Sequence, residues 1–289
     1  MAINLASKFE PKTSELLKAK AKTTSIVNFD WSWDGVNAIN VYTLTDPTMN
    51  DYAANGNFRY GNPDEVQDTK QTFTLSRDRS WTNTIDMSNY QDTLEIRKPA
   101  KFLAQATKNV LVPEVDTYRL ATLATAGALT NGGNYGTITA RNAIVVAGAT
   151  SNSNAYTNLL TINANITDNE APEDGRVAVM TATYYNLLKQ GGFILDSDRG
   201  QDKLNTGDLG MVDGVTIVVC PSGRMPSNTD LIITHPSNLV APEKLKDYTV
   251  HKNPPGVNGY LIEYRIRYDA FFDLNKIFSL GIHKTAWVN

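Results

Sequence analysis

The side chains that could do chemistry in this sequence do not gather into a catalytic or metal-binding motif. Three histidines and one cysteine are present, His235, His251, His283 and Cys220. No histidine has a second ligand at the spacing of a metal site, so we interpret each as structural. Cys220 ends an apolar run, which favours a buried thiol over a nucleophile. The sequence therefore predicts no catalytic residue, no metal ligand, no cofactor and no enzymatic activity.

Two stretches partly resemble known ligand-binding loops, but neither matches the full motif. Residues 196–202 begin like a calcium loop, but Gln201 replaces the required glycine and Gly207 replaces the glutamate at position twelve. Residues 132–136 are too short for a dinucleotide fingerprint, and no glycine-rich run ends in Gly-Lys-Ser or Gly-Lys-Thr. The lack of a complete motif favours a binding protein or a structural protein over an enzyme.

Composition excludes several classes of protein. The 289 residues include 27 basic and 30 acidic side chains, and a net charge of −3 argues against a dedicated nucleic-acid or membrane-surface binder. One cysteine excludes a disulfide framework within the chain. No apolar run approaches the roughly 20 residues of a membrane span. We expect a soluble protein without a targeting signal, made in a reducing compartment.

The first 90 residues are predicted to form segments that cannot form a hydrophobic core of their own. Residues 1–35 form a lysine-rich arm, with five lysines and two glutamates before residue 26. Residues 72–87 alternate strictly between two faces, which predicts one long strand, with residues 37–45 as its partner. A two-stranded hairpin is at best marginally stable alone in water. This hairpin, assigned to residues 36–90, must therefore lie on its own domain or on a neighbouring chain.

A long helix is the clearest element of the middle of the chain, within residues 91–127. Pro99 suits its first turn. Pro113 falls inside it, and because a proline in a helix interior kinks or breaks the helix, we expect a bend there. Glu114 and Asp116 then open its second half, and we interpret them as ordinary helix-start acids that complement the dipole.

The rest of the chain predicts an α/β block and a closing pair of strands. Short helices alternate with β-branched strands between residues 151 and 255. Residues 260–268 alternate with a period of two, and we expect residues 276–288 to return antiparallel beside them.

This order of elements resembles the tailed-phage major capsid proteins with the HK97-type fold. Residues 112–120 (VPEVDTYRL) are similar to the spine helix of such proteins, residues 175–188 and 207–219 to their apical domain, and residues 259–269 to their closing strands. The resemblance implies an α+β fold with five parts: an N-arm (1–35), an E-loop hairpin (36–90), a P-domain with a long spine helix (91–150), a mixed α/β A-domain (151–255) and closing P-domain strands (256–289).

The resemblance also implies a function without enzymatic activity. The chain would assemble with itself, as hexamers and pentamers of an icosahedral shell around double-stranded DNA, without sequence-specific binding and without a membrane. A separate scaffolding protein and a portal would take part in assembly. The protein would be made in the cytoplasm of the bacterial host and end in the virion capsid.

Five hairpin residues are our predicted contacts between subunits, because Arg, Tyr and Trp are favoured interface anchors: Arg59, Tyr60, Arg77, Arg79 and Trp81. Packing of Trp81 within its own subunit is the alternative. Residues 36–90 carry a net charge of −3 and residues 1–25 one of +3, so we expect arm and hairpin of adjacent subunits to meet. Deletion of residues 1–25 is expected to abolish closed shells while the α/β block stays folded.

Two other functions remain open at this stage. Another polymerising virion protein, such as a tail-tube subunit, would also use an extended hairpin, but would lack the long helix and form open tubes. A carbohydrate-binding or hydrolytic module would need clustered carboxylates or an aromatic platform, and the four tryptophans show no such pattern.

Overall fold

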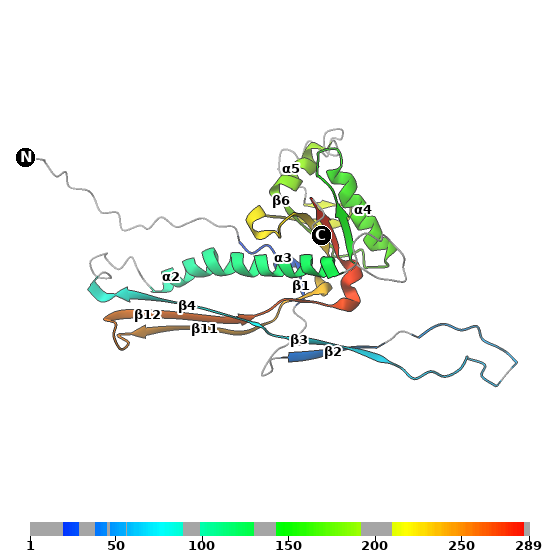
Figure 1. The fold of residues 1–289 in the computed structure, drawn as a ribbon, viewed down its shortest axis with the longest axis horizontal. Helices are drawn as coiled ribbons and strands as arrows, with labels where there is room; N and C mark the ends of the chain where they lie inside the picture. Colours follow the sequence, from blue (N-terminus) through cyan, green and yellow to red (C-terminus); the bar gives the residue numbers. More distant parts are fainter. Residues whose placement is uncertain are drawn as a thin grey trace, which may run out of the picture.

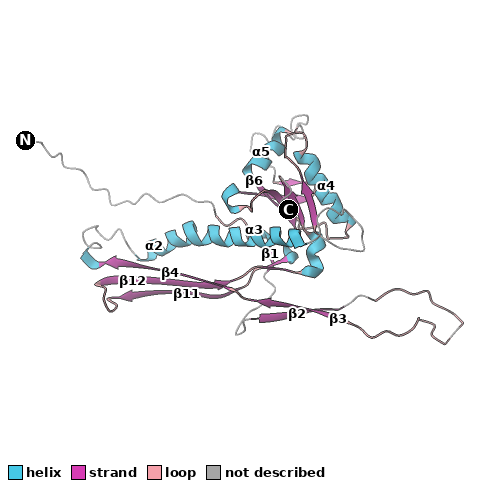
Figure 2. Ribbon diagram, viewed as in Figure 1, coloured by secondary structure: helices cyan, strands magenta, loops and turns pink. Residues whose placement is uncertain are grey.

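The computed structural model describes residues 20–28, 38–44, 47–55, 57–88, 99–129, 143–191 and 210–285. A long helix lies along a narrow three-stranded sheet, and an α/β block covers the C-terminal end of that helix (Figure 1). A two-stranded hairpin extends away from the sheet at the same end, beyond the rest of the molecule (Figure 2).

The long helix runs through three segments: α2 (Pro99–Ala106), the π-helical η2 (Thr107–Leu111) and α3 (Val112–Leu129). The π-helical segment ends two residues before Pro113, and the N–H of Val112 donates to the carbonyl of Thr107, five residues back. Because a proline ring crowds the carbonyl four residues earlier, an irregular turn is the expected response of a helix that continues through a proline. The long helix is confirmed, and a bend at Pro113 stays a prediction.

The three-stranded sheet is antiparallel, in the order β11 (Glu243–Lys252), β12 (Gly259–Tyr268) and β4 (Arg77–Asp86). One face of β12 packs under the helix, where Tyr264, Ile266 and Tyr268 join a buried cluster with Val115. The other face carries charged residues, as its period of two requires.

The expected closing pair of strands is wrong. β12 lies between β11 and β4, and residues 276–285, the described part of the expected partner, do not pair with it. Instead Leu274–Ser279 forms the 3₁₀ helix η5, and β14 (Gly281–Lys284) enters the sheet of the α/β block between β5 and β9. Residues 281–283 are buried, because β14 lies in the interior of that sheet and helices cover both faces of the sheet.

The single strand expected over residues 72–87 is also wrong. β3 (Asp68–Thr74) pairs with β2 (Ala38–Leu44) as the hairpin, and β4 pairs with β12 instead. The break falls at Ser76, whose N–H and hydroxyl both donate to the carboxylate of Asp269, at 2.7 and 2.8 Å. A backbone N–H held by a side chain cannot join a strand ladder, so the chain changes sheets there.

The α/β block is built on a six-stranded sheet with one helical layer on each face. Alternate residues of β6 face opposite layers: Ala178 and Met180 pack under α4 and α5, whereas Val177 and Val179 face α3. The predicted helices and strands of this block are confirmed. In sheet order its elements are β5 (Ile144–Ala147), β14, β9 (Thr229–Thr234), β6 (Val177–Thr181), β8 (Val215–Cys220) and β7 (Met211–Val212), with helices α4 (Ala155–Asp168) and α5 (Ala182–Gln190).

The root of the arm belongs to the core of the subunit. After the 3₁₀ turn η1 (Thr24–Ile26), β1 (Val27–Asn28) pairs with β10 (Leu239–Val240), which in turn pairs with β13 (Phe271–Phe272). Ile26 is fully buried in the cluster that includes the end of α3. The expectation that deletion of residues 1–25 spares the fold therefore needs revision, because such a deletion reaches buried residues.

Candidate interaction surface

The histidines and the cysteine lie in separate settings among the described residues. His283 is fully buried on β14 and shares a 3.1 Å hydrogen bond with Asn158, while His235 bonds to Ser237 at the start of the 3₁₀ turn η4 (Pro236–Asn238). Burial lowers the pKa of both histidines. Cys220 is buried, and desolvation raises the pKa of its thiol to about 11.

No group of three or more His, Cys, Asp or Glu side chains is placed to hold a metal ion within the described part of the chain. Among the same residues, none of the helices has the length and apolar character needed to cross a membrane. The calcium-like loop at 196–202 and the glycine-rich stretch at 132–136 lie outside the described residues.

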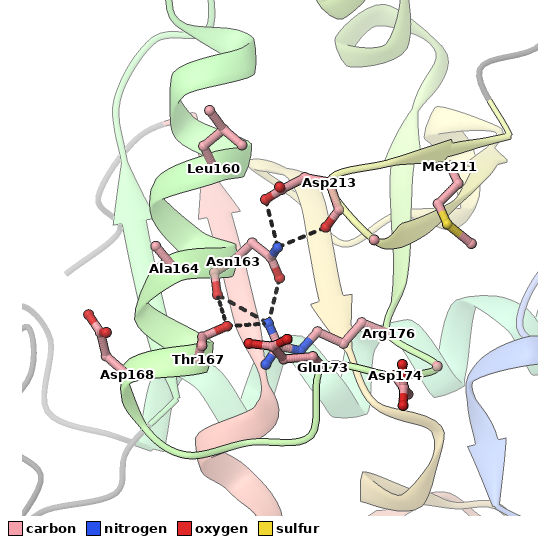
Figure 3. Close-up of a pocket in the computed structure, with 12 residues that line it drawn as sticks. Leu160, Asn163, Ala164, Thr167, Asp168, Glu173, Asp174, Arg176, Met211 and Asp213 are labelled. Carbon is pink, nitrogen blue, oxygen red and sulfur yellow. Dashed lines mark hydrogen bonds between the residues drawn. The ribbon is translucent and has the colours of Figure 1, made fainter.

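A pocket of about 630 Å³ opens between α4 and the turn that joins β7 to β8 (Figure 3). Arg176 forms its wall and is 2% exposed. Its Nε donates to the carbonyl of Pro172, its Nη2 to the carbonyl of Ala171, and its Nη1 to Asn163 Oδ1 at 2.6 Å. The amide of Asn163 donates to the carboxylate of Asp213 at 2.8 Å. Because every nitrogen of Arg176 has a protein partner, this network is a structural link between α4 and β6.

The hairpin tip, which we define as residues 47–55 and 57–67, carries apolar side chains that its own chain does not cover. Seven of the ten large hydrophobic side chains that are exposed among the described residues lie between residues 42 and 66. Tyr60 is 86% exposed and Met49 93% exposed. A monomer rarely exposes so many apolar groups in one segment, which marks an interaction site. Five of them lie on the tip and two on the adjoining strand β2: Met49, Tyr52, Phe58, Tyr60 and Val66, and Tyr42 and Leu44.

Two of the predicted contact residues, Arg59 and Tyr60, lie on this tip. The Arg59 carbonyl accepts a hydrogen bond from the N–H of Ala53 at 3.0 Å, which closes the two sides of the tip on each other. The ring of Tyr60 meets that of Tyr52 edge to face, with centroids 5.1 Å apart. The backbone therefore shapes the tip while both predicted side chains stay exposed.

Arg77, Arg79 and Trp81 lie on β4 instead, on the face of the sheet that meets the long helix. Arg79 Nε donates to Glu114 at 2.7 Å, and this hydrogen bond raises the pKa of Arg79. Trp81 stacks on Tyr264, with centroids 5.7 Å apart, which is the alternative packing within its own subunit. Arg77 lies over the ring of Tyr118, so all three side chains have partners in their own chain, and their contact with a neighbour stays a prediction.

Three carboxylates on or beside the helix hold the parts of the subunit together. Asp116 is 1% exposed and accepts hydrogen bonds from Arg224 Nη1 at 2.8 Å, from the hydroxyl of Thr23 at 2.6 Å and from the N–H of Lys22 at 3.0 Å. It therefore ties the arm root and the loop after β8 to the spine of the molecule.

Glu114 and Asp269 connect the long helix to the strands of the sheet and to the hairpin. Glu114 accepts from Arg79 and from the hydroxyl of Tyr268 at 3.2 Å, which joins the helix to two strands of the sheet. Asp269 accepts from the hydroxyl of Tyr118 at 2.5 Å and from Ser76, so it fixes the hairpin root to the helix.

The helix-start interpretation of these acids is incomplete. Glu114 does lie in the first turn of α3, but its partners come from other elements. For Asp116 the sequence held a signal, since Asp116, Leu120 and Leu123 share one helical face, and that face is buried. An acid on a buried stripe needs a partner, which is a stronger indication than its place near a proline.

Comparison with solved structures places this architecture among known folds. The chain is similar to a structure from Mycobacterium phage Che8, with a TM-score of 0.75, 17% identity, and coverage of 98% of this chain and 99% of that one. It is also similar to the mature capsid of bacteriophage PhiM1, with a TM-score of 0.74, 13% identity, and coverage of 97% and 91%. A third similar structure is the capsid of the cyanophage P-SCSP1u, with a TM-score of 0.76, 11% identity, and coverage of 99% and 94%.

No family model and no curated protein matches the sequence. At this level of identity the solved structures show the fold, and they show it over nearly the whole chain. The predicted fold class, that of the tailed-phage capsid proteins, is confirmed.

Proposed function

We propose that this chain is the major capsid protein of a tailed phage, and that its copies assemble into the shell of the virion. The observation that carries the proposal is the hairpin, which is long, projects from the subunit and exposes apolar side chains along its tip. A subunit that has the fold of phage capsids and leaves such a segment uncovered is suited to self-assembly.

The closed form of the shell would come from hexamers and pentamers in an icosahedral lattice. The two alternatives are not favoured, since the similar structures described above come from phages and two of them are capsids. A tail-tube subunit was expected to lack the long helix, which this chain has as α2, η2 and α3. A carbohydrate-binding module would need an aromatic platform, and Trp81 is instead packed between the helix and the sheet.

The finer parts of the proposal concern partners and location. The shell would enclose double-stranded DNA without reading its sequence, consistent with a net charge of −3. A separate scaffolding protein and a portal would take part in assembly, in the cytoplasm of the bacterial host. The chain would act as a structural protein without catalysis.

Electron microscopy of the purified protein tests this function. We expect closed polyhedral shells or hexameric and pentameric capsomers. Open tubes would favour the tail-tube alternative, and dispersed monomers under all assembly conditions would contradict self-assembly.

A truncation series sharpens the role of the arm. Deletion of residues 1–19 leaves Lys22, Thr23 and their bonds to Asp116 in place, so we expect a folded subunit that fails to close shells. Deletion of residues 1–25 also removes these partners and is expected to lower the stability of the subunit itself. Normal shells from the shorter truncation would contradict a role of the arm in assembly.

A further inference from the structure

The outer side of α2 carries an apolar groove that the described part of the chain leaves open. None of the eight residues of α2 is buried. The groove has a volume of about 460 Å³ and reaches from α2 across η2 to the start of α3. Its lining includes Lys20, Ala21, Ala100, Leu103, Lys108 and Val112. An apolar helix face that stays open marks a place where another segment packs.

The arm root brings the chain to one end of this groove. Thr23 and Lys22 are held on Asp116 of α3 by hydrogen bonds of 2.6 and 3.0 Å. Lys20, just before them, already lines the groove, and its carbonyl accepts a hydrogen bond from Arg224 Nη1 at 3.0 Å. Followed back toward its N-terminus, the chain therefore passes from Asp116 onto the groove.

The residues just before Lys20 are within reach of the groove. From Ala100 to Val112 the groove extends for about 18 Å along the helix. Leu17 lies three residues before Lys20, a step of roughly 4.5 Å in a helix or roughly 10 Å in an extended chain. Both lengths are shorter than the groove, so Leu17 can lie in it in either conformation.

The sequence of this part of the arm suits an apolar groove with a basic rim. Leu16 and Leu17 are the only large aliphatic residues between residues 10 and 25, and Glu15 is the only acid between residues 11 and 25. Lys108 lines the groove, and no acid occurs between residues 99 and 111. The two leucines thus match the apolar floor of the groove, and Glu15 matches its rim.

We propose that residues 12–19 of the arm lie in this groove of their own chain, as a strap along α2, with Leu17 packed against Leu103. The contact forms within one subunit, so it does not depend on assembly into a shell. Because α2 has no buried residue of its own, apolar contact with the strap stabilises it. The strap therefore fixes the outer end of the long helix, and residues 1–11 remain available for contacts with neighbouring subunits.

Disulfide trapping in the purified full-length chain tests the contact directly. The variant Leu17→Cys with Leu103→Cys is expected to form a disulfide within one chain, seen as a monomer of faster migration on a non-reducing gel and as a linked peptide pair in mass spectrometry. Cys220 is buried and keeps the background low. The matched control pairs Leu17→Cys with Val250→Cys, which is 37% exposed on β11 and does not line the groove, and it is expected to stay reduced.

Hydrogen exchange measures the effect of the strap on α2. Leu17→Ser is expected to raise the exchange rates of the α2 amides by roughly tenfold, as for the loss of one buried leucine contact, and to leave those of β6 unchanged. Leu5→Ser, which lies outside the strap, is expected to change neither. Deletion of residues 1–19 should raise the α2 rates at least as much as Leu17→Ser, whereas deletion of residues 1–11 should not.

Two outcomes would overturn the strap. One is the absence of a disulfide within the chain, whether the Leu17→Cys, Leu103→Cys variant stays reduced or cross-links only to another chain. The other is unchanged exchange of the α2 amides in Leu17→Ser, because α2 would then be stable without this cover. A failure of the unaltered chain to form shells would count against the proposed function and would leave both of these measurements valid.

Discussion

The α/β block and the hairpin both contain strands, yet they bury their residues very differently. All five residues of β6 are buried, because α4 and α5 cover one face of the sheet and α3 covers the other. The hairpin has two strands, and although Val41 and Phe73 are buried near its root, its apolar tip is exposed. The block therefore has a core of its own, whereas the order of the hairpin depends on what it contacts.

The hairpin is fixed to the subunit at its root. Gln71 Nε2 donates to the carbonyl of Phe272 at 3.0 Å, and the ring of Phe73 stacks on that of Phe271 with centroids 5.0 Å apart. With the bonds from Ser76 to Asp269, these contacts set the direction in which the hairpin leaves. A rigid root and an uncovered tip suit a segment that reaches a neighbour, and the four changes below test that difference, ordered by their expected effect on stability.

Loss of the buried carboxylate at the joint should have the largest effect. Asp116→Ala removes the carboxylate that neutralises the buried Arg224, so we expect a loss of about 3–5 kcal/mol in the free energy of unfolding. Urea denaturation of the subunit measures it. The control is Asp78→Ala, which breaks an exposed pair with Arg265 and is expected to change stability little. Equal effects of the two substitutions would show that Asp116 does not hold the subunit together.

A cavity in the core of the block should cost nearly as much. Ile162→Ala removes a fully buried side chain of α4, with an expected loss of about 2–5 kcal/mol. Val66→Ala in the hairpin tip, where the side chain is 70% exposed, is the matched control and should fall within about 0.5 kcal/mol of the original. A large loss from Val66→Ala in the isolated subunit would break the contrast between the two regions.

Lowering the pH should decrease the free energy of unfolding of the α/β block through protonation of His283. Burial lowers the pKa of His283 in the folded state, and nearby Asp230 only partly opposes this shift. Below about pH 6.5 the unfolded chain therefore takes up a proton that the folded chain refuses, and stability falls by at most about 1.4 kcal/mol per pH unit. Urea denaturation at pH 7 and pH 5 measures this slope. His283→Gln is expected to reduce it, and an unchanged slope in that variant would contradict the role of His283.

The double change Phe58→Ala with Tyr60→Ala should leave stability unchanged, within about 0.5 kcal/mol, since both side chains are exposed. Its effect should appear in assembly instead, as a loss of closed shells in electron microscopy. Normal shells would show that the aromatic residues of the tip are not interface anchors. A matched change elsewhere on the surface, Met211→Ala at 56% exposure on β7, should assemble normally.

The sequence by itself determined the type of most described elements. The alternation of residues 260–268 predicts β12, the apolar spacing around Pro113 predicts the long helix, and the short β-branched runs predict β6 and β8. Periodicity depends only on neighbours along the chain, so it can be read without knowledge of the fold. The exposed tip was predictable for the same reason, because a two-stranded hairpin cannot cover itself.

Only the tertiary structure decided which strands pair and which charges meet. The alternation through Ser76 is unbroken in sequence, yet Asp269, far along the chain, ends β3 there and sends β4 to another sheet. The sequence pattern of Asp116 is that of a helix-start acid, whereas in the structure Asp116 accepts hydrogen bonds from the arm root and from Arg224. Strand pairing and side-chain burial depend on groups that are distant in sequence. A local sequence pattern carries no information about which of these groups will contact a given residue in the fold.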